Sequence, residues 1–323
     1  MHGTPSVSVR SGAGSGSGWQ SQAVQVSKSV VYRYFAEGSE LLEPCGSDAL
    51  VLDVDLTASD THLEVAADSP VRRKGGKVFG LSHTVRDWCA MSGAIAGVNG
   101  GFFGETDGVN KQAEGLLVVG GKVYNSGRWI KSTRRPGESF LRCALAVRRD
   151  GAPQIGWATC QPDGEMRMYD RPLSPAGSRS FGISSAVACG PRLIAAGGQA
   201  ISDEKERLVS SLALPRTFVA YDYARDNQTG KPKPHHFVMG IAMQMTYHDV
   251  ARFLQNYFRK QHNAECAEAM CLDGGSSSQL VYRASTRGST GRAGAAPSEE
   301  DWIDARPSHV TVPTALLVVD GRE

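Results

Sequence analysis

Three features are scarce in this sequence: long hydrophobic runs, closely spaced cysteines and an excess of charge of one sign. No apolar run approaches the roughly 20 residues that cross a bilayer as a helix, so no membrane span is expected. The formal net charge is only +2, which provides no long-range field to attract nucleic acid. The seven cysteines form no CxxC pair, so a zinc site of the usual spacing is not expected.

Several short catalytic signatures are also missing. The serine-rich GGSSS is not the G-x-S-x-G elbow of a serine hydrolase, and no glycine-rich stretch ends in the GK[ST] of a phosphate loop. Asp273 lacks the alternating Asp and Asn partners of a calcium loop. These absences argue against serine hydrolysis and nucleotide hydrolysis. We expect no metal and no cofactor, although a divalent ion held by less regular ligands remains open.

The compartment is less constrained by the sequence. The N-terminus shows no charged end followed by an apolar stretch, so no signal peptide is visible. An odd number of cysteines leaves at least one thiol unpaired, and one or two disulfides are possible if the protein is exported. The order of the cysteines does not determine their pairing.

The residue pattern favours an α+β protein. The 323 residues are 41% hydrophobic and 21% charged, which is typical of a globular chain. Short apolar runs outnumber helical patterns, and most neighbouring runs look like hairpins. We therefore expect a mixed or mostly antiparallel sheet with a few packed helices in a single catalytic domain. Ala49–Leu56 alternates as a half-buried strand should, and Val310–Val319 is expected to close the sheet.

The chain divides into segments of different composition. Residues 1–22 are rich in Gly and Ser and are expected to be a flexible tail. Residues 23–79 supply either the first strands of the domain or an appended segment, and residues 80–323 hold the main domain. Within it, 284–309 is a long loop rich in Gly, Ser, Arg and Pro.

Two helices are expected from their N-terminal signals. Thr84 and Asp87 have the spacing of a helix N-cap with an acidic residue three places on, as have Thr246 and Asp249. The second helix carries an apolar stripe, which predicts packing against the core; the stripe consists of Val250, Phe253, Leu254, Tyr257 and Phe258. His248, in the first turn, is expected to face solvent.

The stretch Ala269–Tyr282, AMCLDGGSSSQLVY, contains the main candidate site. Two apolar runs flank a Gly/Ser cluster, which predicts strand, tight loop and strand. Asp273 then stands at a strand end beside the backbone of Gly274–Ser277, where a carboxylate near free backbone N–H groups can act on a bound anion. Taken alone, the same stretch also fits a β-turn with a solvated aspartate. Cys271 is expected to be a small buried side chain rather than a nucleophile.

Two further stretches carry polar groups at strand ends. Ala94–Phe103 reads as a strand that ends on Asn99, two glycines and an aromatic pair, and an ordinary bend with a core Phe pair fits equally well. Arg216 lies in the strand-like LALPRTFVAYD, where its guanidinium would suit a bidentate grip on phosphate or carboxylate; a surface arginine is the alternative. Asp222, at the end of that run, is expected to be a turn residue.

Seven motifs, taken together and in order, resemble the phosphodiester glycosidase family. The resemblance covers roughly residues 80–320, and its motifs are short, so their common order carries the argument. They are GVNGGFF (97–103), EGLLVVGGK (114–122), CGPRLI (189–194), PRTFVAYD (215–222), the helix from Thr246, CLDGGSSS (271–278) and VPTALLVV (312–319).

The resemblance implies a hydrolase that cleaves between the anomeric carbon of a sugar and a phosphodiester oxygen, with N-acetylglucosamine or a related sugar as the substrate. It implies an exported or periplasmic location. The positions that match the family pattern are Asn99, Gly101, Phe103, Gly115, Arg216, Thr217, Asp273, Gly274, Gly275 and Ser277. Ser276 replaces the third glycine of the family's usual DGGGS loop, which changes how closely a ligand can approach.

The residue types suggest a role for each candidate. Cleavage passes through an oxocarbenium-like transition state, in which a carboxylate can stabilise the positive charge, attack the anomeric carbon or activate a water molecule. Asp273 is the first choice for the carboxylate. Arg216 would bind the phosphate, together with main-chain N–H groups of Gly274–Ser277. Asn99 would contact a sugar hydroxyl or acetamido group, with Phe103 as an apolar wall under the ring. Glu114 is a candidate second carboxylate, or a charge at a hairpin edge.

Two other functions remain open at this point. The same fold could serve a hydrolase or lyase that acts on non-phosphorylated glycosides of an exopolysaccharide. It could also serve a non-enzymatic carbohydrate- or envelope-binding protein, in which the DGGSSS loop is only a structural turn.

Overall fold

The computed structural model is dominated by strands, which hold 53% of the described residues against 14% in helices. Every strand pair formed by the described residues is antiparallel. Of the two sheet types expected for an α+β protein, mixed and mostly antiparallel, the described residues form the antiparallel one. The structure describes residues 21–43, 47–68, 71–72, 78–79, 82–105, 111–127, 130–131, 139–161, 165–169, 171–172, 179–209, 211–226, 229–284 and 301–320.

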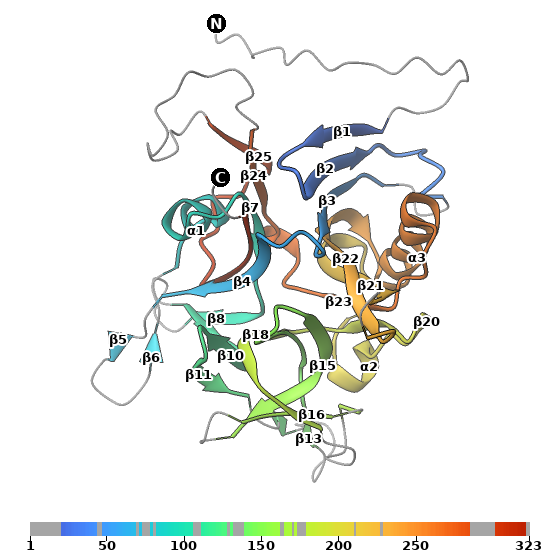
Figure 1. Ribbon diagram of the computed structural model, residues 1–323. Coiled ribbons are helices and arrows are strands. Elements are labelled where there is room, and N and C mark those ends of the chain that lie inside the picture. The colour runs from blue at the N-terminus through green and yellow to red at the C-terminus, as the bar shows by residue number, and fades with distance from the viewer. Residues whose placement is uncertain are drawn as a thin grey trace, which may run out of the picture.

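Three large sheets make up most of the protein (Figure 1). The eight-stranded sheet has the order β1 (Gln22–Gln25), β2 (Val30–Phe35), β3 (Ala49–Asp55), β22 (Pro232–Met245), β21 (Leu214–Arg225), β23 (Glu268–Cys271), β19 (Arg192–Ala195) and β20 (Gly198–Gln199). The five-stranded sheet has the order β25 (Trp302–Arg306), β24 (Leu280–Arg283), β7 (Ala96–Asn99), β26 (Thr314–Asp320) and β4 (Thr61–Ala67).

The third large sheet has seven strands, and the described residues also form three separate two-stranded sheets. Its order is β11 (Lys122–Ser126), β10 (Leu116–Val119), β18 (Ile183–Cys189), β14 (Cys143–Arg148), β15 (Pro153–Cys160), β16 (Met166–Tyr169) and β17 (Arg179–Phe181). The small pairs are β5 (Val71–Arg72) with β6 (Val78–Phe79), β8 (Phe103–Glu105) with β9 (Lys111–Ala113), and β12 (Ile130–Lys131) with β13 (Ser139–Phe140).

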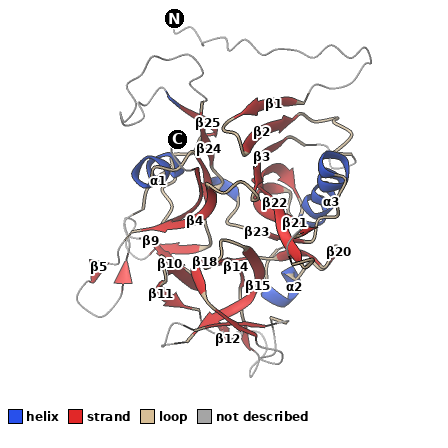
Figure 2. Ribbon diagram, in the orientation of Figure 1, coloured by secondary structure: helices blue, strands red, loops and turns tan. Residues whose placement is uncertain are grey.

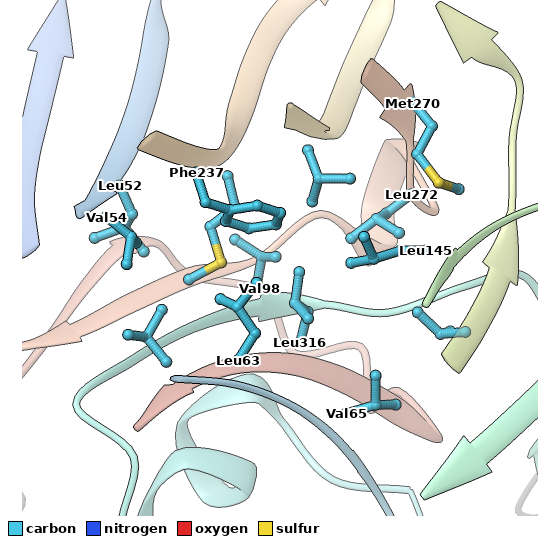
Figure 3. Packing of buried hydrophobic residues seen from close by; sticks show 14 of the residues in the cluster. Leu52, Val54, Leu63, Val65, Val98, Leu145, Phe237, Met270, Leu272 and Leu316 are labelled. Carbon is cyan, nitrogen blue, oxygen red and sulfur yellow. The ribbon is translucent and has the colours of Figure 1, made fainter. Parts of the chain in front are cut away.

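The largest hydrophobic cluster is shared by all three sheets. Figure 3 shows Phe237 of the eight-stranded sheet, Val98 and Leu316 of the five-stranded sheet and Leu145 of the seven-stranded sheet in one buried group. Burial of apolar surface between the sheets is the main term that holds them together. Loops that pass from one sheet to another, as the loop at Asp273 does, are therefore anchored at both ends.

The helices cover the outer faces of two sheets (Figure 2). Helix α1 (Val85–Ser92) lies on the five-stranded sheet, α3 (Tyr247–Tyr257) lies on the eight-stranded sheet, and α2 is a single turn (Asp203–Glu206). Both expected capping boxes are present, at Thr84 with Asp87 and at Thr246 with Asp249. The five residues of the predicted apolar stripe of the second helix are 0% exposed, so its packing role is confirmed.

Three expectations about strands need correction. Ala49–Leu56 was expected to be half-buried, but both faces of β3 are covered, because Leu50 and Leu52 face the central core while Val51 faces the cluster under α3. β26, within the run expected to close the sheet, lies instead between β7 and β4. Asp222 is no turn residue: it lies within β21 and is 1% exposed.

Two of the strands before residue 68 pair with strands from much later in the chain. β3 pairs with β22 and β4 pairs with β26, so this segment contributes to two of the large sheets. The six cysteines among the described residues are all buried and unpaired. Among the described helices, none combines the length and apolar character that crossing a membrane requires.

Candidate active site

Asp273 lies in the loop that leaves β23 of the eight-stranded sheet and enters β24 of the five-stranded sheet through the 3-10 turn η2 (Gly275–Ser277). Its backbone is fixed by the end of β7: its N–H donates to Gly100 O (3.1 Å), and its carbonyl accepts from Asn99 Nδ2 (2.7 Å). Its carboxylate accepts from Gly274 N (3.0 Å) and from the Ser277 side chain. These hydrogen bonds hold the Asp273 carboxyl group in a well-defined position.

Asn99 joins three parts of the site. The Asn99 side chain is 0% exposed. Besides its bond to the Asp273 carbonyl, it forms two more hydrogen bonds, in which Oδ1 accepts from Thr217 Oγ1 (2.8 Å) and from Gln279 N (3.1 Å). This amide was expected to contact a sugar hydroxyl or acetamido group, but its oxygen and its nitrogen both form hydrogen bonds within the protein. We therefore treat Asn99 and Thr217 as positioning residues for the Asp273 loop.

The carbonyl groups of the Asp273 loop accept hydrogen bonds from two residues that were not candidates from the sequence. Arg306 donates to Ser278 O and to Gly275 O, the latter at 3.1 Å, and Ser308 Oγ donates to Ser276 O (2.7 Å). Burial lowers the pKa of the Arg306 guanidinium. Arg306 is the last residue of β25, so the stretch 284–309, expected to be one long loop, contains a strand of the five-stranded sheet.

Arg216 lies beside the same loop. Gly274 packs so closely against β21 that a Cβ there would lie 2.7 Å from Pro215 O and 3.8 Å from Arg216 Cδ. The guanidinium stacks 4.0 Å above the Tyr247 ring and donates to Leu212 O (2.8 Å) and Met245 O (3.4 Å). Its hydrogen bonds to described residues occupy two of its five N–H groups. Arg216 is therefore packed against the loop that carries Asp273.

The β8–β9 hairpin brings two further charges close to Asp273. Glu114 follows β9, is exposed, and donates its backbone N–H to Phe102 O (2.7 Å). Lys111, in β9, is 8% exposed, donates from Nζ to Thr311 O (2.7 Å) and lies 4.9 Å from the Phe103 ring centroid. Glu114 and Phe103 were candidates from their sequence motifs, whereas Lys111 was not.

The environment of Asp273 raises its pKa from 3.8 to about 6. Burial is the largest cause, because it penalises the charged form. The hydrogen bonds from Ser277 and Gly274 act in the opposite direction; the negative charge of Glu114 raises the pKa further and the positive charge of Lys111 lowers it. A carboxyl group that titrates near neutral pH is suited to proton transfer and to charge stabilisation.

Two of the predicted glycines explain how the hairpin reaches the site. Gly101 and Gly115 both pack against Ala188 of β18: a Cβ at Gly101 would overlap the Ala188 carbonyl oxygen, and one at Gly115 would lie 2.8 Å from the Ala188 Cβ. Gly115 also has φ +82°, which favours glycine. Close packing at these two positions places Glu114 and the aromatic pair beside the Asp273 loop.

The remaining predicted residues form the loop itself. Gly275 has φ +64°, and a Cβ there would meet no described atom within 4 Å. Ser276 is exposed and Ser277 is buried. Cys271, two residues before Asp273, is 1% exposed, and burial raises the pKa of its thiol to about 12. This thiol is a packing residue rather than a nucleophile, as expected from the sequence.

A profile of the phosphodiester glycosidases (NAGPA) matches residues 92–319, well over half of the chain. The chain belongs to the phosphodiester glycosidase family. The matched region includes every residue of the site described above, from Asn99 to Thr311. It begins after β3 and β4, which nevertheless pair with strands inside it. A comparison with curated proteins gives no significant match.

Two solved structures resemble this family member in fold. One is a hypothetical protein from Synechocystis, at 10% identity and a TM-score of 0.53; the match covers 93% of this chain and 64% of that one. The other is the zebrafish N-acetylglucosamine-1-phosphodiester alpha-N-acetylglucosaminidase catalytic domain, auto-inhibited by its pro-peptide, at 16% identity and a TM-score of 0.52, covering 94% of this chain and 88% of that one. At these identities the likeness shows a shared fold. The exported or periplasmic location stays a prediction.

Proposed function

We propose that this protein hydrolyses the bond between the anomeric carbon of a sugar and the oxygen of a phosphodiester. The observation that carries the proposal is the Asp273 carboxyl group, which the end of β7 and its own loop hold in place, and whose pKa of about 6 is raised in part by the nearby carboxylate of Glu114. Arg216 packs against the same loop. Membership of the phosphodiester glycosidase family supports the reaction class.

The residues divide the chemistry between them. Cleavage passes through an oxocarbenium-like state, which an ionised carboxylate can stabilise, attack or serve by activating water. At neutral pH Asp273 is mostly ionised, given its pKa of about 6. The leaving phosphate is already stable as an anion, so a strong general acid is not required. We therefore assign the ionised form of Asp273 to catalysis and give Glu114 the supporting role.

Phosphate recognition falls to Arg216 and to part of the loop backbone. The N–H of Gly274 is used by Asp273 Oδ1, and that of Ser277 donates to Gly274 O (3.3 Å). This leaves Gly275 and Ser276 as the loop positions whose N–H groups we assign to a phosphate oxygen. Lys111 adds a second positive charge on the Asp273 side of the site.

The sugar that we propose first is N-acetylglucosamine, because the zebrafish structure of the same fold is named for that substrate. The test is release of free sugar from a N-acetylglucosamine-1-phosphodiester, beside a neutral glycoside of the same sugar. We expect turnover of the phosphodiester by the wild type. No product from either substrate would favour a binding protein, and turnover of the neutral glycoside alone would favour the exopolysaccharide alternative.

Arg216→Gln is expected to lower kcat/KM for the phosphodiester by about 100-fold, because a phosphate-directed cation is lost. The same change should alter turnover of a neutral glycoside by less than about threefold. Arg216→Lys, which keeps the charge but not the planar fork, should recover part of the loss. Steady-state kinetics on both substrates measure this. Equal losses on both would show that Arg216 acts only through the fold, and the phosphate role would be withdrawn.

The pH profile reports on the ionised carboxylate. Since kcat/KM follows the free enzyme, it should fall about tenfold per unit as the pH drops below the Asp273 pKa of about 6. Glu114→Gln removes a like charge, so the midpoint of this acid limb should move to lower pH, whatever the change in maximal rate. A profile that instead falls above pH 6 would assign the protonated form of Asp273 to catalysis and contradict our assignment.

A further inference from the structure

A second cluster of polar side chains lies at the other end of β21. It contains Asp222, His235 and His236, whose potential ligand atoms all lie within 4.8 Å of one another. Asp222 is five positions beyond Thr217 on the same strand, which corresponds to about 16 Å at the rise of a β-strand. The cluster is therefore distinct from the site around Asp273, and the proposed hydrolysis makes no use of it.

A β-bulge explains how two consecutive histidines reach one carboxylate. The pairing of β21 with β22 shifts between Tyr221, opposite Phe237, and Tyr223, opposite Pro234. One extra residue of β22 is accommodated there, so His235 and His236 together oppose Asp222. Neighbouring residues of a regular strand point to opposite faces, whereas a bulge re-aims one of them. The two imidazole rings lie with their centroids 3.7 Å apart.

The surrounding contacts hold the cluster in place. Asp222 is 1% exposed; its Oδ1 accepts from His236 N (2.7 Å), and its Oδ2 lies 2.8 Å from His236 Nδ1. The His236 ring also stacks on His262, whose Nε2 lies 2.9 Å from Asp53 Oδ2. His235 and His236 are only partly buried, which leaves solvent access to the cluster.

We propose that Asp222, His235 and His236 bind a divalent transition-metal ion of the zinc type. Two imidazole nitrogens and one carboxylate oxygen suit zinc rather than calcium or magnesium, which prefer oxygen ligands. Three protein ligands leave a coordination position for water. Two donors about 2.0–2.1 Å from a tetrahedral zinc lie about 3.3 Å apart. His236 Nδ1 and Asp222 Oδ2, now 2.8 Å apart, need to separate by only about half an ångström when the ion replaces the proton between them.

The experiment is titration of the full, chelator-treated protein with Zn²⁺ by calorimetry, with Co²⁺ as a spectroscopic probe of the ligand set. We expect one saturable ion per chain, a higher Tm in its presence, and visible Co²⁺ bands typical of a low coordination number. His235→Ala should weaken the affinity by at least about 100-fold, with an unchanged circular dichroism spectrum. Its side chain has no hydrogen bond to a described residue that the fold would lose.

The matched control is His62→Ala. His62 lies beside Glu64, with Nε2 3.2 Å from Oε1, and is exposed, so it is a histidine–carboxylate pair without the third ligand. Its replacement should leave the zinc affinity unchanged. Zinc binding no tighter than millimolar in the wild type would overturn the proposal, and so would an affinity that His235→Ala leaves unchanged. The wild-type titration decides the matter even if a variant fails to fold.

Discussion

Asp273→Asn is expected to lower the turnover of a sugar-1-phosphodiester by about 10²–10⁴-fold, the range usually found when a catalytic carboxylate is neutralised. Asparagine has nearly the same shape, and its Oδ1 can still accept from Gly274 N, now 3.0 Å from the Asp273 oxygen. The backbone bonds of residue 273 to Asn99 and Gly100 do not involve the side chain. The change therefore removes the negative charge while the loop keeps its position. Sugar release at pH 7 is the measurement.

The stability of the same variant separates a catalytic defect from a folding defect. The pKa of Asp273 is raised from 3.8 to about 6 in the folded state, so the folded protein binds the proton more tightly than the unfolded chain. The stability associated with this group is fully present below pH 3.8 and is lost as the pH rises through 6. The shift corresponds to at most about 3 kcal/mol.

We therefore expect Asp273→Asn to be more stable than the wild type at pH 7 and about equal to it near pH 4. Urea unfolding at the two pH values measures the difference in free energy of unfolding. Loss of activity with a gain of stability would show that the carboxylate is kept for its chemistry. Turnover within about threefold of the wild type would instead remove Asp273 from the catalytic step, and the DGGSSS loop would then be a structural turn.

Local signals in the sequence predicted much of the fold. The helix from Thr246 is specified by its own capping box and apolar stripe, so it could be predicted without knowledge of the rest of the chain. The strands on either side of Asp273 are likewise marked by short apolar runs and a Gly/Ser loop. In contrast, the burial of β3 on both faces depends on α3, which is nearly 200 residues away in the sequence, and alternation alone gave the wrong exposure.

The candidate site was predicted less completely, because its geometry depends on contacts between distant segments. The amide of Asn99 is buried by Thr217 and Gln279, which no pattern around Asn99 reveals. Lys111 and Arg306 were missed because their contacts, to Thr311 O and to Gly275 O, join segments that are far apart in the sequence. Asp222 was taken for a turn residue because the bulge that pairs it with two histidines is a property of strand register. Register is set by pairing across strands rather than by one segment.

The second large effect is expected from Gly101→Ala, which adds one methyl group at the end of β7. A Cβ at this position would overlap the carbonyl oxygen of Ala188 and lie 3.1 Å from Val187 Cγ2. Both neighbours belong to β18, inside the seven-stranded sheet, so the obstacle is backbone that cannot rotate away. Overpacking of this kind costs about 3 kcal/mol, or more when the backbone must move. Urea unfolding should show this loss directly.

Gly104→Ala is the matched control, three residues further along the same segment. Among the described residues its Cβ would meet only Glu114 Oε1, at the ordinary distance of 3.8 Å, so the change in free energy of unfolding should stay within about 1 kcal/mol. Activity should follow the same order, because a shifted Gly101 also displaces Gly100, whose carbonyl accepts from Asp273 N. If both alanine variants are equally stable, close packing against Ala188 does not position this loop. Other contacts would then have to place the β8–β9 hairpin, and Glu114 with it, beside Asp273.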